Sequence, residues 1–297
     1  MRALDEIRAE LAGRRLQSGG WSSLARGLQT ALEPTCLALL ALSFQAGPHT
    51  LEPLLRLERR DGSWRAFEGD EEGSGLTSLA LLTLNLLGAR RDSQRRAVEW
   101  LLSARGREAS WPWKWKFRVR DTRARFDPAK FGWPWHPGTC SWVIPTSFAL
   151  LALKHTLPTH ASRNVAQRVR RAAEMLHDRA CPGGGWNAGN GIVYGRPMAP
   201  HVDSTAIALL ALQNEPPSEI IESSLTWLDR NAHSCRAVWS LAWSALALDA
   251  YRHDAGALIK CLAALVEPQE TSDTATLAIA ALALDCPGRG NIFEVEG

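Results

Sequence analysis

The phrase TCLALLAL, Thr35–Leu42, returns three times along the chain in nearly the same form. Its close copies are TSLALLTL (Thr77–Leu84), TSFALLAL (Thr146–Leu153) and TAIALLAL (Thr205–Leu212), and looser copies follow at Ser244–Leu248 and Asp273–Leu284. Each copy is rich in Ala and Leu and has no polar face, which predicts a helix buried on every side. Several begin near Pro, Asp, Ser or Thr, which suit a helix start. The repeats therefore predict about six inner helices.

More polar, amphipathic segments precede these copies, for example Arg2–Leu16, Ser93–Ala104, Val165–Arg179 and Ser218–Asn231. Outer helices with one wet face around inner helices with none describe a two-layer ring. The copies are spaced too unevenly for an open solenoid of uniform units, whereas a closed barrel accommodates such variation in its loops. We predict an all-α fold over residues 1–297, a single (α/α)6 barrel or toroid of about six helical hairpins. A plain helical-repeat scaffold is the alternative.

Composition limits the partners and the cellular setting. A net charge of +3 with 22% charged residues is too mild to indicate nucleic acid as a partner. No apolar run approaches the roughly 20 residues that span a bilayer, and the stretch Met1–Leu16 is charged and amphipathic rather than a signal peptide. The 6 cysteines include no CxxC pair and are expected to be reduced. We expect a cytoplasmic protein, with peripheral membrane contact left open.

A second repeat relates a leucine to a tryptophan at a constant spacing. The four pairs are Leu11 with Trp21, Leu54 with Trp64, Leu101 with Trp111 and Leu176 with Trp186. A glycine stands two residues before the tryptophan in three pairs, and Ala109 takes that place in the other. A glycine turn after a helix is common, but it does not explain a fixed leucine-to-tryptophan register.

This pattern resembles the QW repeat of squalene and oxidosqualene cyclases, in which an aromatic–leucine pair is followed by Gln and then by Gly-x-Trp. Trp100-Leu101 with Trp111, and Met175-Leu176 with Trp186, match that spacing. The Gln is replaced in every copy, by Arg15, Glu58, Arg105 and Ala180. The chain is thus similar to the prenyltransferase and squalene cyclase repeat family. The resemblance implies a single-barrel, class II terpene cyclase-like protein with degenerate QW repeats.

The segment HVDSTA, residues 201–206, carries the candidate acid. Class II terpene cyclases protonate an olefin or epoxide with an aspartic acid that its surroundings keep protonated. By the resemblance, Asp203 falls on the proton-donating position of that motif, with His201 and Ser204 in place of its neighbouring acids or cysteine. These three are the candidate catalytic residues. Equally, Asp203 is explained as the cap of its helix, as is Asp273 at the last copy.

Zinc is not expected. Protein prenyltransferases share the barrel and hold zinc through an Asp-x-Cys pair and a later His, but Thr205 and Thr274 stand where the Cys and the His would be needed. No other Cys and His residues have the spacing of metal ligands. We therefore expect no metal and no cofactor.

An aromatic and basic insertion interrupts the repeats at residues 111–142. Its first part, WPWKWKFRVR (Trp111–Arg120), alternates aromatic or apolar residues with basic ones. A period of two predicts an extended segment with two faces. We expect one face to pack on the barrel (Trp111, Trp113, Trp115, Phe117, Val119) and the other to point outward (Lys114, Lys116, Arg118, Arg120). The basic face suits a diphosphate or an anionic lipid surface. A lid with merely solvated cations is the alternative.

The abundance of tryptophan predicts an aromatic pocket. There are 13 Trp and only 2 Tyr, and indole faces stabilise carbocations. The expected substrate-binding residues are Trp135, Trp142, Trp186, Tyr194, Trp239, Trp243 and Arg196. Tyr194 and Arg196 follow a glycine-rich loop that is expected to line the mouth.

Three functions remain open. The first is a class II terpene cyclase-like enzyme that cyclises a linear isoprenoid after protonation, with a hydrophobic isoprenoid as its small-molecule partner. The second is a non-catalytic α/α barrel that binds an isoprenoid or lipid. The third is a glycan-active α/α barrel, which needs two inner carboxylates facing each other. Asp203 with Glu33 or Asp273 would supply them, since each lies at the start of an inner helix.

Overall fold

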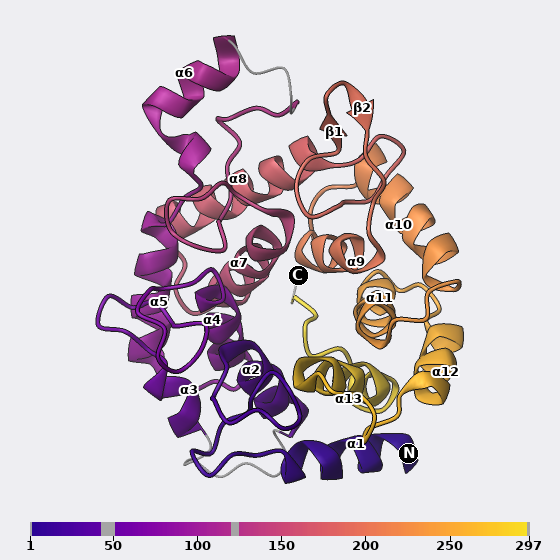
Figure 1. The fold of residues 1–297 in the computed structure, drawn as a ribbon. Helices are drawn as coiled ribbons and strands as arrows, with labels where there is room; N and C mark the ends of the chain where they lie inside the picture. The colour runs from indigo at the N-terminus through magenta and orange to yellow at the C-terminus, as the bar shows by residue number, and fades with distance from the viewer. Residues whose placement is uncertain (1, 43–50, 120–124, 296–297) are drawn as a thin grey trace.

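The structure is a computed structural model that describes residues 2–42, 51–119 and 125–295. In these ranges a ring of inner helices surrounds the centre in the order α2 (Leu32–Ala41), α4 (Thr77–Leu86), α7 (Val143–Thr156), α9 (Val202–Ala211), α11 (Val238–Ala250) and α13 (Thr274–Arg289). Each packs on the next, and α13 packs on α2, which closes the ring (Figure 1). The predicted all-α toroid is confirmed.

An outer layer of amphipathic helices covers this ring. It comprises α1 (Arg2–Gly13), α3 (Glu52–Arg56), α5 (Arg91–Ser103), α8 (Arg163–Arg179), α10 (Glu219–Ala232) and α12 (Gly256–Leu265). Outer α8 buries only one stripe of side chains, whereas inner α9 buries every residue from position 204 to 211. The predicted alternation of amphipathic and fully buried helices is therefore present, with small differences at the helix ends. Within the described ranges, no helix has both the length and the apolar composition to cross a bilayer.

Backbone hydrogen bonds join the loops that precede neighbouring inner helices. They run from the N–H of Thr274 to Ser23 (2.9 Å), Leu32 to Ala66 (2.8 Å), Gly75 to Trp135 (2.7 Å) and Val143 to Ala188 (3.0 Å). Because each bond links the starts of two neighbouring inner helices, these starts lie on the same face of the ring. We call this face, formed by the N-terminal ends of the inner helices, the mouth.

The C-terminal tail closes the opposite face. After α13 the chain turns toward the centre of the ring (Figure 1), where Phe293 is fully buried. Gln213, just after α9, donates a hydrogen bond from Nε2 to the Phe293 carbonyl oxygen (3.0 Å), and Asn291 donates from Nδ2 to the Leu246 carbonyl oxygen (2.8 Å). Since Gln213 follows α9 and Leu246 lies in the C-terminal half of α11, the tail seals the ring on the side away from the mouth.

Aromatic side chains fill the interior between the tail and the mouth. Phe148 on α7 and Trp243 on α11 have ring centroids 5.7 Å apart, and Trp243 and Phe293 have centroids 5.4 Å apart. Helix α9 separates α7 from α11 in the ring, so the contact between Phe148 and Trp243 crosses the interior. All three side chains are almost fully buried. The interior of the ring is therefore a packed core.

The first part of the insertion is not extended. Trp111–Val119 forms helix α6, and the N–H of Lys114 donates to the Ser110 carbonyl oxygen (2.9 Å) at its start. Pro112 in the first turn suits a helix start. The period-two pattern was misleading because an extended segment needs a partner strand for its backbone groups, whereas a helix satisfies its own.

The predicted faces of this segment change accordingly. Trp111 and Trp115, expected to pack on the barrel, are 78% and 55% exposed. Arg120 lies outside the described residues, so its predicted orientation is not addressed. For Phe117, Arg118 and Val119 the structure describes the helical backbone but not the side chains.

Candidate functional site

The tryptophans of the leucine–tryptophan repeat hold the two layers together. The indole Nε1 of Trp21, Trp64 and Trp186 donates to the carbonyl oxygen of the predicted leucine partner, Leu11 (2.7 Å), Leu54 (3.0 Å) and Leu176 (2.7 Å) respectively. Each indole is almost completely buried. Trp186, predicted to bind substrate, is therefore part of the scaffold.

In the third copy of the leucine–tryptophan repeat, the tryptophan that pairs with Leu101 is not the predicted Trp111. Trp133 donates to the Leu101 carbonyl oxygen (2.9 Å), and Trp111 does not take this place. Arg168 on α8 stacks on the Trp133 ring, with its guanidinium carbon 3.7 Å from the centroid, and donates to the carbonyl oxygens of Ala104 (2.8 Å) and Gly132 (3.2 Å). The inserted chain thus leaves the barrel and returns before the structural tryptophan.

The threonine that opens each close copy anchors the inner helix to the same loop. The backbone N–H of the tryptophan donates to the threonine Oγ1, in the pairs Trp21–Thr35 (3.1 Å), Trp64–Thr77 (2.8 Å), Trp133–Thr146 (3.0 Å) and Trp186–Thr205 (2.9 Å). Because the tryptophan lies between the layers, each threonine side chain points outward from the ring.

The residue two positions before that threonine points inward. An α-helix turns about 100° per residue, so positions two apart face nearly opposite directions. In the close copies where this residue is part of the helix, the inward positions are Glu33, Ile144 and Asp203. Helices α2 and α9, which carry the two acidic residues, are separated by two inner helices on either side and so lie opposite each other in the ring. Glu33 and Asp203 are both half-buried, and the helix geometry directs them toward the mouth from opposite sides of the ring.

The Glu33 carboxyl is held close to neutral. Burial, followed by the negative charge of Asp273 on the neighbouring α13, raises the pKa of Glu33 to about 7. Asp273 itself caps α13, since its Oδ2 accepts a hydrogen bond from the Thr276 N–H (2.7 Å). The prediction that Asp273 is a helix cap is confirmed. The charge of a carboxylate is favoured at that helix N-terminus.

Asp203 does not have the same cap role. The residue before α9 is His201, whose side chain makes no capping hydrogen bond and whose N–H donates to the Trp186 carbonyl oxygen (2.8 Å). Among the described residues no hydrogen bond to the Asp203 carboxylate is found, so the alternative of a simple cap is not supported. The His201 side chain is exposed beside the mouth, whereas Ser204 is buried.

Three of the predicted aromatic residues lie at or near the mouth. Trp239, in the first turn of α11, is half-buried and packs edge-on against the deeper Trp243, with centroids 5.7 Å apart. Trp135 is half-buried in the loop that bonds to Gly75, and Trp142, just before α7, is exposed. Trp243 lies below them in the core, with its indole Nε1 unpaired within the described structure.

Tyr194 and Arg196 do not join this group. Tyr194 has a positive φ of 51° at the turn of a short hairpin, β1 (Ile192–Val193) and β2 (Arg196–Pro197), and its side chain is exposed. Figure 1 shows this hairpin outside the inner ring, near α9 and α10. Phe148 and Phe293, which close the interior, were not predicted from the sequence. Phe148 carried a signal, because the other close copies have Leu or Ile at its position.

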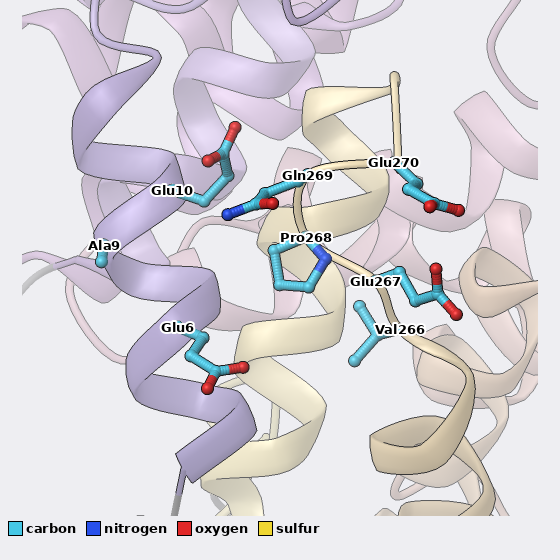
Figure 2. A pocket seen from close by; sticks show the side chains of 8 residues that line it. All are labelled: Glu6, Ala9, Glu10, Val266, Glu267, Pro268, Gln269 and Glu270. Atoms are coloured by element: carbon cyan, nitrogen blue, oxygen red, sulfur yellow. The ribbon is translucent and has the colours of Figure 1, made fainter.

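A separate acidic pocket lies in the outer layer. Glu6, Glu10, Glu267 and Glu270 surround about 650 Å³ between α1 and the loop that follows α12 (Figure 2). A hydrogen bond with Glu270 and its charge raise the pKa of Glu267, while Arg14 pairs with Glu10 (2.7 Å). Across the described chain, no three His, Cys, Asp or Glu side chains are grouped to hold a metal ion.

Comparison with known proteins gives a fold and no family. No family model matches the chain, and comparison with curated proteins gave no significant sequence match. Among solved structures, the chain is similar to one described as a novel α-amylase from Clostridium perfringens, with TM-score 0.64, 11% identity, and 95% of this chain and 97% of that chain covered. It is also similar to cellobiose 2-epimerase from Spirochaeta thermophila, with TM-score 0.57, 13% identity, and coverages of 94% and 96%.

These comparisons correct the main functional prediction. These two similar structures are described as an α-amylase and a cellobiose 2-epimerase, so the prediction of a class II terpene cyclase-like enzyme is wrong. The resemblance to the squalene cyclase family holds only for the α/α barrel. The interior gives the physical reason, since a linear isoprenoid would need the space that Phe148, Trp243 and Phe293 occupy.

Proposed function

We propose that this protein is a carbohydrate-active enzyme that hydrolyses a glycosidic bond at the mouth, with Glu33 as general acid and Asp203 as general base. The observation that carries the proposal is the equivalent, inward position of these two residues on opposite inner helices. The two similar solved structures, both described as enzymes that act on sugars, support the same class of substrate.

The ring geometry leaves room for inversion at the anomeric carbon. Helices that pack about 8–10 Å apart in a six-membered ring have opposite axes about 16–20 Å apart. Subtracting the helix radii and the reach of a Glu and an Asp leaves a gap on the order of 5–10 Å between the carboxyl groups. Inverting glycosidases need roughly 6.5–9.5 Å, because a water molecule must fit between the base and the sugar.

The two carboxyl groups are suited to different roles. A general acid must carry a proton at the working pH, and the raised pKa of Glu33, about 7, meets this requirement near neutrality. Asp203 lies in the first turn of α9 at the mouth, where a water molecule beside it would be placed for attack. Glu33 would protonate the leaving oxygen while Asp203 takes a proton from the attacking water.

Trp239 would supply the surface on which a sugar ring rests. It is half-buried at the mouth on α11, the inner helix next to α9. Its edge-on contact with Trp243 supports it from below. A rigid indole presents a broad apolar face at low conformational cost, which suits the C–H-rich face of a pyranose.

The test is a hydrolysis screen with purified protein on soluble starch, maltooligosaccharides and cello-oligosaccharides. Reducing ends are measured, and the anomer first formed is read by proton NMR. We expect hydrolysis with inversion, reduced about 100-fold or more in Glu33→Gln and in Asp203→Asn, the usual scale of general acid–base catalysis. Matched controls are Glu99→Gln and Asp229→Asn in the outer helices, which should keep full activity.

Azide separates the two roles, because it can replace the base-activated water but not the acid. An azide-dependent, inverted glycosyl azide is expected from Asp203→Ala with an activated substrate, and not from Glu33→Ala. Absence of product from every glycan in the screen would overturn the proposal, as would variants as active as the wild type. If cellobiose is epimerised and no glycan is hydrolysed, the proposed activity would have to change from hydrolysis to sugar isomerisation.

A further inference from the structure

Helix α6 projects from the outer layer with two indoles in solvent. Figure 1 shows α6 at the edge of the molecule, beyond α5 and α8, and its main contact within the described chain is the short 3-10 helix at residues 107–109. Trp111 and Trp115 are 78% and 55% exposed. They are four residues apart and therefore share one side of the helix. Exposed indoles side by side form an apolar patch with no partner among the described residues.

The opposite side of α6 is fixed to the protein. Trp113 is two residues from each exposed indole and faces away from them. The Arg107 guanidinium carbon lies 4.5 Å from the Trp113 ring centroid, and the Lys116 Nζ lies 4.4 Å from it. Lys114 Nζ lies 5.7 Å from the Phe131 ring centroid. The contact of Arg107 with Trp113 holds this side of the helix, so Trp111 and Trp115 stay outward. Lys114 and Lys116 lie on the flanks of the helix, between Trp113 and the exposed indoles.

Charge is concentrated in the same segment. Residues 111–120 contain four basic residues and no acidic residue, although the whole chain has a net charge of only +3. The segment therefore carries more positive charge than the protein as a whole. An exposed pair of indoles among cations combines the two features of helices that bind at an anionic bilayer surface: amphipathic rings at the level of the headgroups, and attraction to anionic lipid.

We propose that α6 docks this protein on an anionic lipid surface, with Trp111 and Trp115 in the headgroup region and Lys114 and Lys116 near lipid phosphates. The contact is peripheral, since no described helix is long and apolar enough to span a membrane. Duplex readout and phosphate contacts do not require apolar rings in solvent, whereas unpaired bases can stack on exposed indoles, so single-stranded nucleic acid is the competing ligand in the test. This proposal is independent of catalysis at the mouth.

The experiment is sedimentation of the purified chain with vesicles of phosphatidylcholine alone and of phosphatidylcholine with 30% phosphatidylglycerol. We expect binding to the anionic vesicles at least tenfold tighter than to the neutral ones, and weakened by salt. Two double variants, Trp111→Ala with Trp115→Ala and Lys114→Glu with Lys116→Glu, should each lose at least tenfold in the partition coefficient. The matched control is Lys260→Glu with Arg163→Glu, exposed cations elsewhere on the outer layer, which should bind as the wild type does.

Circular dichroism and urea unfolding of each variant verify that the barrel remains folded. Equal binding to neutral and anionic vesicles, or α6 variants that bind like the control, would overturn the proposal. A fluorescent single-stranded oligonucleotide is titrated in parallel. Binding to it through α6, without binding to vesicles, would assign the helix to nucleic acid and also reject the lipid proposal.

Discussion

The indole nitrogen of Trp133 donates to the Leu101 carbonyl oxygen from 32 residues further along the chain, whereas the other three indoles reach a leucine 10 residues before them. The same tryptophan donates its N–H to Thr146, 13 residues later, a separation also seen between Trp64 and Thr77. The same indole-to-carbonyl hydrogen bond therefore joins the two layers in all four copies, although the number of residues between its partners differs. The insertion enters between the outer helix and its tryptophan.

Trp133→Phe should destabilise the protein because it leaves the Leu101 carbonyl oxygen unpaired in a buried site. We expect the free energy of unfolding to fall by about 1–3 kcal/mol, the cost of an unsatisfied buried polar group. Trp111→Phe is the matched control at the position that fits the sequence spacing, and its effect should stay within about 0.5 kcal/mol. Urea unfolding measures both. Equal losses in the two variants would contradict this assignment of the register.

Glu33 should make stability fall as pH rises. Its folded-state pKa of about 7 lies above its ordinary value of 4.5, so between these values the folded state binds the proton and the unfolded state releases it. The resulting loss in the free energy of unfolding is absent below pH 4.5 and complete above pH 7. Its upper limit is about 3 kcal/mol, from the size of the pKa shift.

The check is a pair of urea unfolding series from pH 4 to 8. Wild type should lose stability relative to Glu33→Gln across the window from about 4.5 to 7. The substitution Glu99→Gln, on the outer helix α5, should leave the pH dependence as it is in wild type. A constant difference between wild type and Glu33→Gln across the series would show that the carboxyl is not buried as described.

The repeated phrases were sufficient to predict the barrel, because a helix without a polar face must be buried whatever surrounds it. The role of the tryptophans was harder to predict. A tryptophan at a fixed register has the same sequence pattern whether it lines a pocket or joins two layers. The leucine in that register was the informative partner, since its carbonyl oxygen accepts the indole N–H in three of the predicted pairs.

The candidate site was partly visible in the sequence. Glu33 and Asp203 were recognised as residues at the starts of inner helices, but their opposition depends on the closure of the ring, which local patterns do not encode. The helical conformation of residues 111–119 was missed because alternation in the sequence is compatible with a helix when no neighbouring strand is present. The tail was missed because Phe293 is a single aromatic residue outside any repeat.

Phe293→Ala should open the closed end of the ring. The side chain is fully buried against Trp243 and its backbone is tied to Gln213. Replacing a buried Phe by Ala typically costs about 3–5 kcal/mol, including the cavity that it leaves. Leu28→Ala, at a side chain that is 93% exposed, should have almost no effect on the urea midpoint. A loss below about 1 kcal/mol for Phe293→Ala would mean that the tail does not seal the interior.

Asp273→Asn should move the titration of Glu33 to lower pH without removing the helix cap. The charge of Asp273 is the second cause of the raised pKa of Glu33, after burial, and Asn caps a helix about as well as Asp. Without that charge the pKa of Glu33 should decrease but stay above 4.5, because burial remains.

If Glu33 is the general acid, the alkaline fall of kcat/KM near pH 7 should shift to lower pH in Asp273→Asn and stay unchanged in the control Glu270→Gln. The stability window of Glu33 should shift in the same direction, which tests the coupling without an assay of activity. An alkaline limb that does not move while the stability window does would mean that another group donates the catalytic proton.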